Sequence, residues 1–152
     1  MVARLDPLDA RILKSLSENA RKSFRDMARE LAVSLSTISN RVRRLEDEGI
    51  IKGYIPVVDA AKVGYELTVV IGVRIAHGKL IDVQNRIAKN PQVFGVYDVT
   101  GEWDSLILAR FGNREEMNVF IKGVLAIEHV ERTFTQLVLN TMKEEKRVLP
   151  PA

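Results

Sequence analysis

The stretch AVSLSTISNRVRRLEDEGIIKGY, from Ala32 to Tyr54, decides how the first third of the chain folds. Ser34 is a good helix N-cap, because its hydroxyl can accept a hydrogen bond from a backbone N–H of the first turn. Gly49 suits the left-handed position at which many helices end. Between these two residues apolar side chains recur at helical spacing, so the stretch predicts a helix whose buried face carries Ile38, Val42 and Leu45.

The opposite face of this predicted helix is polar and basic. Short hydroxyl and amide side chains come first, which allows close approach to DNA, and arginines a turn later can reach phosphates or guanine edges. Arg41 projects nearer the core edge than Arg43 does, which indicates packing or a backbone phosphate contact rather than base reading. A solvated surface helix explains the same composition, and the helix taken alone favours that alternative. The candidate DNA-binding residues are Ser34, Ser36, Thr37, Ser39, Asn40, Arg41, Arg43 and Arg44.

The residues before this helix predict two more short helices. Asp6, followed by proline, can cap the first, and Ser23 can cap the second, which runs to Leu31. With the tight turn that follows, the second and third helices form a helix-turn-helix, whose second helix enters the major groove of DNA. The glycine that is usual in this turn is absent, because Ala32 lies in that region.

From Ile50 onward the sequence becomes β-rich, with Gly and Pro breaks that are expected of an extended linker. The remaining segments predict the order βαββαβ, which is the ferredoxin-like arrangement with both helices on one face of an antiparallel sheet. The predicted strands and helices are residues 67–75, 80–89, 93–100, 105–111, 114–125 and 130–139. The fold class is therefore α+β. The predicted domains are a helix-turn-helix domain at 1–50, a linker strand and hinge at 51–64, a ferredoxin-like domain at 65–142 and a tail at 143–152.

Charge and composition limit the classes of protein to consider. All of the +3 excess lies in residues 1–54, with eleven Lys or Arg against eight Asp or Glu, whereas residues 55–152 carry twelve of each. This surplus permits a polyanionic partner. Without Cys, the chain has no disulfide, thiolate zinc site or cysteine nucleophile. No apolar run approaches the roughly 20 residues of a membrane span and no signal peptide is found, so we expect a cytoplasmic protein. We also expect no metal or organic cofactor.

The segment Val99–Asp104 joins the two central predicted strands. Its residue types alone favour a hairpin in which Gly101 supplies a special backbone angle, while Thr100 and Asp104 make local turn bonds. This interpretation gives the segment no role beyond the turn.

Three stretches carry a resemblance to a known family: LDPLDARILKSLSENAR (5–21), FRDMARELAVSLSTISNRVRRLEDEGIIKGY (24–54) and GVYDVTGEWDSLILAR (95–110). Together they resemble the Lrp/AsnC (feast/famine) transcriptional regulators, over nearly the whole chain. The resemblance implies an N-terminal helix-turn-helix, a linker strand and a C-terminal ferredoxin-like domain for dimerisation and amino-acid sensing. It also implies double-stranded DNA as a partner, and self-association as a dimer and a higher oligomer (tetramer or octamer) that responds to an amino-acid effector.

The resemblance assigns the loop at residues 99–104 to effector binding. Gly101 would let a ligand approach the backbone, and Asp104 would pair with an α-ammonium group. Trp103 stands where a tyrosine is common in the family. The family's pocket is completed across a subunit interface, partly from the last strand. The candidate effector-binding residues are Tyr97, Thr100, Gly101, Glu102, Trp103, Asp104, Thr133 and Thr135.

Two other functions are compatible with the same two-domain organisation. Haem-pathway decarboxylases need histidine and basic residues around a porphyrin, whereas this chain has only His77 and His129, both at the ends of predicted strands. No carboxylate pair, phosphate loop or nucleophile motif is found, so we expect a protein that is not an enzyme. A DNA-binding architectural protein that senses no ligand is the second alternative.

Overall fold

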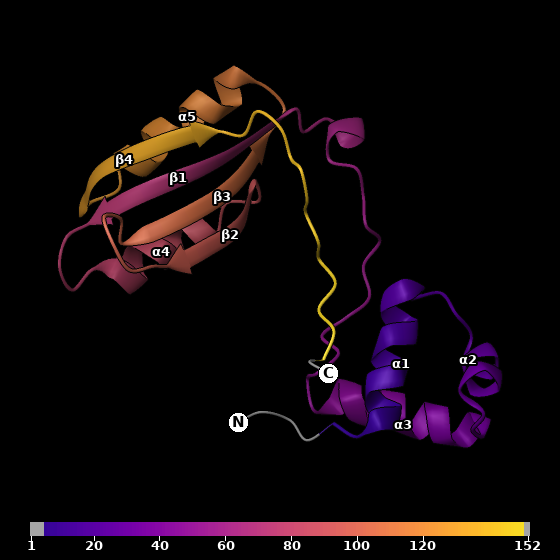
Figure 1. The fold of residues 1–152 in the computed structure, drawn as a ribbon. Coiled ribbons are helices and arrows are strands. Elements are labelled where there is room, and N and C mark those ends of the chain that lie inside the picture. The colour runs from indigo at the N-terminus through magenta and orange to yellow at the C-terminus, as the bar shows by residue number, and fades with distance from the viewer. Residues whose placement is uncertain (1–4, 151–152) are drawn as a thin grey trace. The chain divides into compact units, whose positions relative to one another are not determined.

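The chain forms two units, each with its own hydrophobic core (Figure 1). The computed structural model describes residues 5–150. The helical unit contains residues 5–56 together with 143–150, and the α/β unit contains residues 57–142. The division falls inside the predicted linker.

The helical unit consists of α1 (Pro7–Glu18), α2 (Phe24–Leu31) and α3 (Leu35–Asp47). Each helix begins where its predicted cap stands, because the side chains of Asp6, Ser23 and Ser34 each accept a hydrogen bond from a backbone N–H three residues on. The apolar stripes of the three helices meet in one core: Ile12, Leu16, Met27, Ala28, Leu31, Ile38, Val42 and Leu45. The three predicted helices and the helix-turn-helix order are confirmed.

The turn between α2 and α3 places Ala32 in the left-handed region, at a φ of 55° and a ψ of 45°. Its N–H donates to the carbonyls of Ala28 and Arg29, so the unusual angle closes the end of α2. A Cβ in this conformation is strained, whereas glycine adopts it freely. Alanine therefore occupies the position at which the motif usually has glycine, and keeps the same backbone geometry.

We expect Ala32→Gly to stabilise the helical unit by about 1 kcal/mol, because the substitution removes this strain. Urea unfolding followed by far-ultraviolet circular dichroism measures the change. The matched control is Ala10→Gly, inside α1, which should destabilise the unit by about 1 kcal/mol. A loss of stability in Ala32→Gly would contradict the strain argument.

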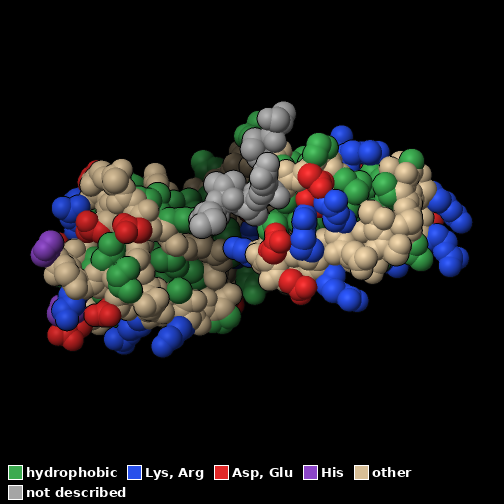
Figure 2. Space-filling view, turned by 90° about the horizontal axis from the view of Figure 1, so that it is seen from below, with side chains coloured by type: hydrophobic (Ala, Val, Ile, Leu, Met, Phe, Trp, Pro, Cys, Tyr) green, Lys and Arg blue, Asp and Glu red, His purple; other side chains and the backbone are tan. Residues whose placement is uncertain are grey.

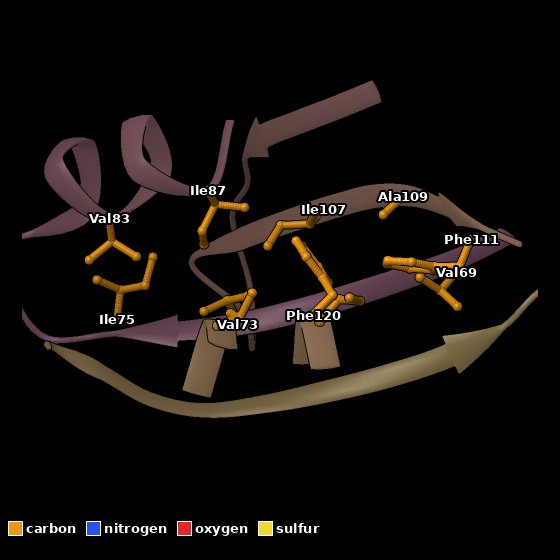
Figure 3. Packing of buried hydrophobic residues seen from close by; sticks show 11 residues of the cluster. Val69, Val73, Ile75, Val83, Ile87, Ile107, Ala109, Phe111 and Phe120 are labelled. Atoms are coloured by element: carbon orange, nitrogen blue, oxygen red, sulfur yellow. The ribbon is translucent and has the colours of Figure 1, made fainter. Parts of the chain in front are cut away.

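The α/β unit contains one antiparallel sheet covered on one face by two helices (Figures 1 and 3). Its strand order is β2-β3-β1-β4, the order of a ferredoxin-like sheet, so the predicted fold is confirmed. Val83 and Ile87 of α4 point toward Ile75 and Ile107 of the sheet in Figure 3. The elements are β1 (Leu67–Ile75), α4 (Leu80–Ala88), β2 (Val93–Asp98), β3 (Ser105–Phe111), α5 (Arg114–Leu125) and β4 (Val130–Leu137).

The predicted linker strand at residues 51–64 is not a paired strand in the single chain. These residues are extended without ladder bonds, apart from a short 3-10 helix, η1, at Ala61–Val63. A strand needs a neighbour to pair with, and the described part of this chain offers it none. Two predicted strands also end early: β2 stops at Asp98, where the loop begins, and β4 stops at Leu137.

The start of the linker is hydrogen bonded to the helix that precedes it. The Tyr54 hydroxyl donates to Oε1 of Glu46 at 2.9 Å. Burial, together with this bond to a carboxylate, raises the pKa of Tyr54 to about 12. Tyr54 therefore belongs structurally to the end of α3.

The sheet face that carries no helix presents aromatic and aliphatic side chains to solvent. Gly72 in β1 lies opposite Leu106 in β3 and Phe134 in β4 on this face. Phe94 and Tyr97 of β2 are 41% and 52% exposed, and Phe134 is 52% exposed. This uncovered face is called the open face below. Exposed apolar side chains gathered on one face are typical of a surface that binds another protein.

Candidate functional site

The outward face of α3 has the composition that the helical projection predicts. Ser36, Asn40 and Arg43 are exposed, while Ile38 and Leu45 on the other side are fully buried. The side chains nearer the edges, Thr37 and Ser39, are half-buried. Lys and Arg side chains appear at several places over the helical unit in Figure 2.

Hydroxyl groups organise the first turn of α3. Oγ of Ser34 accepts a hydrogen bond from the Thr37 N–H at 3.1 Å. The same oxygen lies 2.9 Å from the Ser36 hydroxyl and 2.7 Å from the Thr37 hydroxyl. Ser34 therefore fixes the start of the helix, and its oxygen is already hydrogen bonded within the protein.

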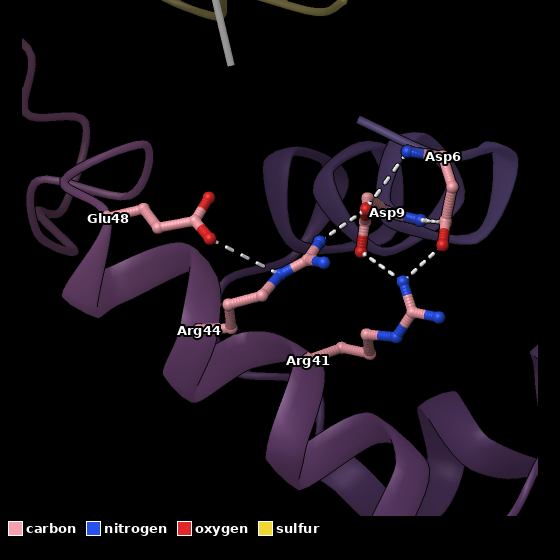
Figure 4. A network of polar contacts seen from close by, with 5 residues as sticks. All are labelled: Asp6, Asp9, Arg41, Arg44 and Glu48. Atoms are coloured by element: carbon pink, nitrogen blue, oxygen red, sulfur yellow. Dashed lines mark hydrogen bonds and ion pairs between the residues drawn. The ribbon is translucent and has the colours of Figure 1, made fainter. Parts of the chain in front are cut away.

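Two of the three arginines of α3 point away from the outward face, toward the start of α1 (Figure 4). Nη1 of Arg41 donates to Oδ1 of Asp9 at 3.0 Å and also contacts Asp6. Nη2 of Arg44 donates to Oδ2 of Asp9 at 2.5 Å. The inward direction of Arg41 agrees with its predicted place near the core edge, whereas Arg44 was expected to reach DNA and is held against α1 instead.

Arg43 is the arginine of α3 that faces solvent. Its side chain makes no ion pair or hydrogen bond within residues 5–150. Two further exposed arginines, Arg25 and Arg29, lie on α2, and Arg29 has only a 3.6 Å pair with Asp26. The sequence interpretation did not include these two, although the first helix of the motif crosses the DNA backbone in such proteins.

Asp6 is the partly exposed member of the Arg41 cluster. The Asp9 N–H and the Arg41 guanidinium hold the pKa of Asp6 below its ordinary value of 3.8. A pKa that is lower in the folded than in the unfolded chain gives stability above the unfolded value, and this stability is lost as the pH falls through the folded value.

We therefore expect Asp6→Asn to weaken the helical unit near neutral pH and to have less effect in acid. Asparagine still caps a helix, so the charge is the main loss. Urea unfolding at about pH 7 and about pH 3 measures the difference between the two chains. A difference that stayed the same at both pH values would show that the Asp6 charge contributes nothing.

The loop at residues 99–104 lies next to an ion-pair cluster. Oδ2 of Asp104 accepts the Ile75 N–H at 2.8 Å, and Oδ1 lies 3.4 Å from Nη1 of Arg74. That same Arg74 nitrogen donates to the Glu102 carbonyl at 2.9 Å. Gly101 has a φ of +118°, which is the special backbone angle expected of it. The Asp104 carboxylate thus has a donor at each oxygen before any ammonium group binds.

Trp103 lies across Gly72 on the open face. A Cβ on Gly72 would fall 2.6 Å from the indole ring, so the ring needs glycine beneath it. The indole stacks with Phe134, with ring centroids 5.9 Å apart, and the Arg132 guanidinium lies 4.7 Å from the indole centroid. Arg132 also pairs with Glu102 at 2.9 Å.

The other candidate effector residues are divided between two sheet faces. Tyr97 lies opposite Leu106 and belongs to the open face, as Trp103 does. Thr133 and Thr135 lie opposite Val73 and Ile71, so they belong to the face that the helices cover, although Thr133 also borders the hollow beside Trp103. Thr100 and Glu102 line a second hollow with Trp103. One chain does not bring all eight residues into a single site.

Comparison with protein families matches both units. Residues 68–148 match the Lrp/AsnC ligand binding domain, and residues 5–52 match a winged helix-turn-helix DNA-binding domain. The chain belongs to the Lrp/AsnC family. Like its Lrp/AsnC relatives, it is a DNA-binding transcriptional regulator.

Individual relatives match this Lrp/AsnC chain over nearly their full length. An HTH-type transcriptional regulator of Pyrococcus horikoshii is 44% identical over 146 residues, which cover 96% of this chain and 99% of the relative. The HTH-type transcriptional regulator FL11 of the same organism is 34% identical over 140 residues, with 92% and 93% coverage. These relatives are transcriptional regulators, so the chain is not an enzyme and the decarboxylase alternative is wrong.

Solved Lrp/AsnC-type structures share the fold. Escherichia coli AsnC has a TM-score of 0.88 and 26% identity, covering 94% of this chain and 97% of that one. A Neisseria meningitidis regulator solved as a complex with L-Met has a TM-score of 0.87 and 28% identity, with 95% and 96% coverage. None of the helices described between residues 5 and 150 has the length and apolar content to cross a bilayer.

Proposed function

We propose that this Lrp/AsnC regulator reads the major groove with the outward face of α3 and changes its assembly or DNA binding when an amino acid binds. Reading would fall to Ser36, Asn40 and Arg43, with Thr37 and Ser39 at the edges. The observation that carries this assignment is the exposed Arg43, which has no partner within residues 5–150. Residues 1–50 would serve DNA binding, 51–64 the linkage and 65–142 sensing and assembly, in the cytoplasm.

The geometry of α3 suits a groove contact. Short side chains on the first two turns let the helix approach base edges, and Arg43 can extend to a guanine or a phosphate from the next turn. Arg25 and Arg29 on α2 would bind phosphates alongside. A twofold dimer would present two copies of α3 to half-sites about 10 bp apart, or a multiple of that spacing.

We expect Arg43→Ala to weaken binding to a selected DNA duplex about tenfold and to flatten its salt dependence by about one counterion. Fluorescence anisotropy across a series of salt concentrations measures both quantities. The control is Arg86→Ala, which makes the same charge change on an exposed residue of α4. Equal effects of the two substitutions would contradict a groove contact at Arg43.

The proposed effector site lies at the loop of residues 99–104, beside Trp103. Support comes from the match to the family's ligand binding domain and from the L-Met complex of the Neisseria relative. Glu102 is largely exposed and Arg132 pairs with its Oε1, so its Oε2 could meet an ammonium group even though Asp104 already has two donors. Residues from a second subunit, among them Thr133 and Thr135, would complete the site.

Self-association is proposed through the open face of the sheet. Apolar side chains exposed there would be buried against a second copy, as a dimer interface requires. Calorimetry with each common amino acid, followed by sedimentation with and without any that binds, tests the sensing and the assembly together. If no amino acid gave a heat of binding, the second candidate would be favoured, which is a regulator that senses no amino acid. The two donors already on Asp104 also favour this second candidate.

A further inference from the structure

We propose that Arg41 and Arg44 are positioning residues, which join α3 to the start of α1 and so set the orientation in which α3 meets DNA. This inference rests on the proposed use of α3 in groove reading. It withdraws both arginines from the set of direct DNA contacts and adds Asp6 and Asp9 to the residues on which DNA reading depends.

The spacing of the two arginines places Arg44 at one edge of the outward face and Arg41 beyond that edge. Residues three apart on a helix are neighbours on one side, so Arg41 and Arg44 form a pair one turn apart. Arg43 is rotated away from Arg44 by about 100°, with Asn40 between the two arginines on the projection, so Arg43 and Arg44 lie on opposite flanks of Asn40. Figure 4 shows both paired guanidinium groups directed at α1 rather than along the outward face.

The two carboxylates of α1 neutralise the two guanidinium groups. Asp9 is fully buried and each of its oxygens accepts a hydrogen bond from a different arginine. Asp6 contacts Arg41 as well, while Asp6 and Asp9 cap each other's backbone N–H. Moving either arginine to a phosphate would remove one of the two charged donors of the buried Asp9 carboxylate, which is unfavourable.

The Arg44 guanidinium is partly enclosed by protein. Its Nε is buried and makes no hydrogen bond within the described chain, and Oε1 of Glu48 lies 3.8 Å from it. The Arg44 side chain is 40% exposed, but its Nη2 is bonded to the buried Asp9 carboxylate, so the exposed part of the group is held against α1. Arg44 therefore serves the contact between α1 and α3.

These ion pairs fix the orientation of α3 relative to α1, which the apolar core alone does not fix. Burial of Ile12 and Leu16 of α1 against α3 depends on area and not on angle. Charge-assisted bonds from two arginines to one carboxylate fix both the rotation and the sliding of α3 on α1. Base reading needs such precision, since productive contacts tolerate only about 0.5 Å of displacement.

The test compares Arg44→Gln with Arg43→Gln in the full-length chain. One probe is a duplex enriched by selection from random DNA with the unaltered chain, and the other is a random-sequence duplex of equal length. Affinity for each duplex is measured over a series of salt concentrations, at a temperature where circular dichroism shows that the variants are folded. Asp6→Asn is the third variant, because asparagine preserves the cap of α1 while removing the charge that faces Arg41. Glu18→Gln, at the exposed end of α1, controls for the change in net charge.

The expected results separate positioning from contact. Arg43→Gln should lower the salt slope by about one on both duplexes, because it removes a phosphate or base contact. Arg44→Gln should lower the preference for the selected duplex by about tenfold or more and leave the salt slope unchanged. Asp6→Asn should show the same kind of loss, although Asp6 is an acid and cannot itself attract DNA.

Two results would overturn the positioning role. A salt slope reduced by Arg44→Gln as much as by Arg43→Gln would make Arg44 a phosphate contact. If Asp6→Asn bound DNA more tightly and with a steeper salt slope than Glu18→Gln, an Arg41 released from Asp6 would be binding phosphate. Asp6→Asn decides between the two roles if Arg44→Gln does not fold. A failure of the unaltered chain to enrich any sequence would refute groove reading itself, and the positioning role with it.

Discussion

Replacing Asp9 with alanine is expected to destabilise the helical unit by about 1.5–3 kcal/mol, because it removes a buried carboxylate that accepts hydrogen bonds from two partly exposed guanidinium groups. Two guanidinium groups would remain at the boundary of α1 and α3 without the carboxylate that accepts from both. The substitution also removes the carboxylate that accepts the Asp6 N–H. Thermal and urea unfolding followed by far-ultraviolet circular dichroism should show loss of helix well before loss of the sheet.

The control for this prediction is Asp47→Ala, at the exposed end of α3. Asp47 has no ion pair among the described residues, so its removal should change the stability by less than about 0.5 kcal/mol. Trp103 is the only tryptophan of the chain and lies in the α/β unit, so its fluorescence follows that unit separately. Equal stabilities of the Asp9 and Asp47 variants would mean that the cluster contributes no net stability.

Gly72→Ala is expected to displace Trp103 and to destabilise the α/β unit by about 1–3 kcal/mol, the usual cost of overpacking. The added methyl would fall 2.6 Å from the indole, and the atoms that it meets are ring carbons near the Cβ, so the whole side chain must move. The stack with Phe134 would be lost with it. Tryptophan emission should shift to longer wavelength as the ring enters water.

Gly123→Ala provides the matched control in the same unit. A Cβ at Gly123, in α5, meets no atom within 4 Å, so the helix should gain about 0.5–1 kcal/mol from alanine. Unchanged emission and stability in Gly72→Ala would refute the close contact between the Trp103 ring and Gly72 of β1. Because Trp103 belongs to the proposed effector loop, the same variant should also alter any amino-acid response.

Local signals were enough to predict the elements of the fold. The capping side chains of Asp6, Ser23 and Ser34 mark the starts of α1, α2 and α3, and an apolar run marks β1. Each of these signals is contained within a few neighbouring residues. The outward polar face of α3 follows from the same periodicity.

Contacts between distant residues were not predictable in this way. The bonds from Arg44 and Arg41 to α1 join residues 32 to 35 positions apart, and a projection of α3 alone cannot tell which edge a second helix covers. A signal was present, since an Asp pair and an Arg pair share a spacing of three residues, Asp6 with Asp9 and Arg41 with Arg44. The faces of Thr133 and Thr135 depend on the register of β4 against β1, which the sequence of β4 does not contain.

The hydrogen bond from Tyr54 to Glu46 determines where the tether between the two units begins. Since Tyr54 is held to the end of α3, the stretch without helix or strand hydrogen bonds starts at Ile55 and ends where η1 begins, at Ala61. The tether is thus the six residues Ile55–Ala60, which extended can span about 20 Å. In the proposed dimer, the separation between the two copies of α3 would be limited by the length of these linkers as well as by the symmetry of the two α/β units.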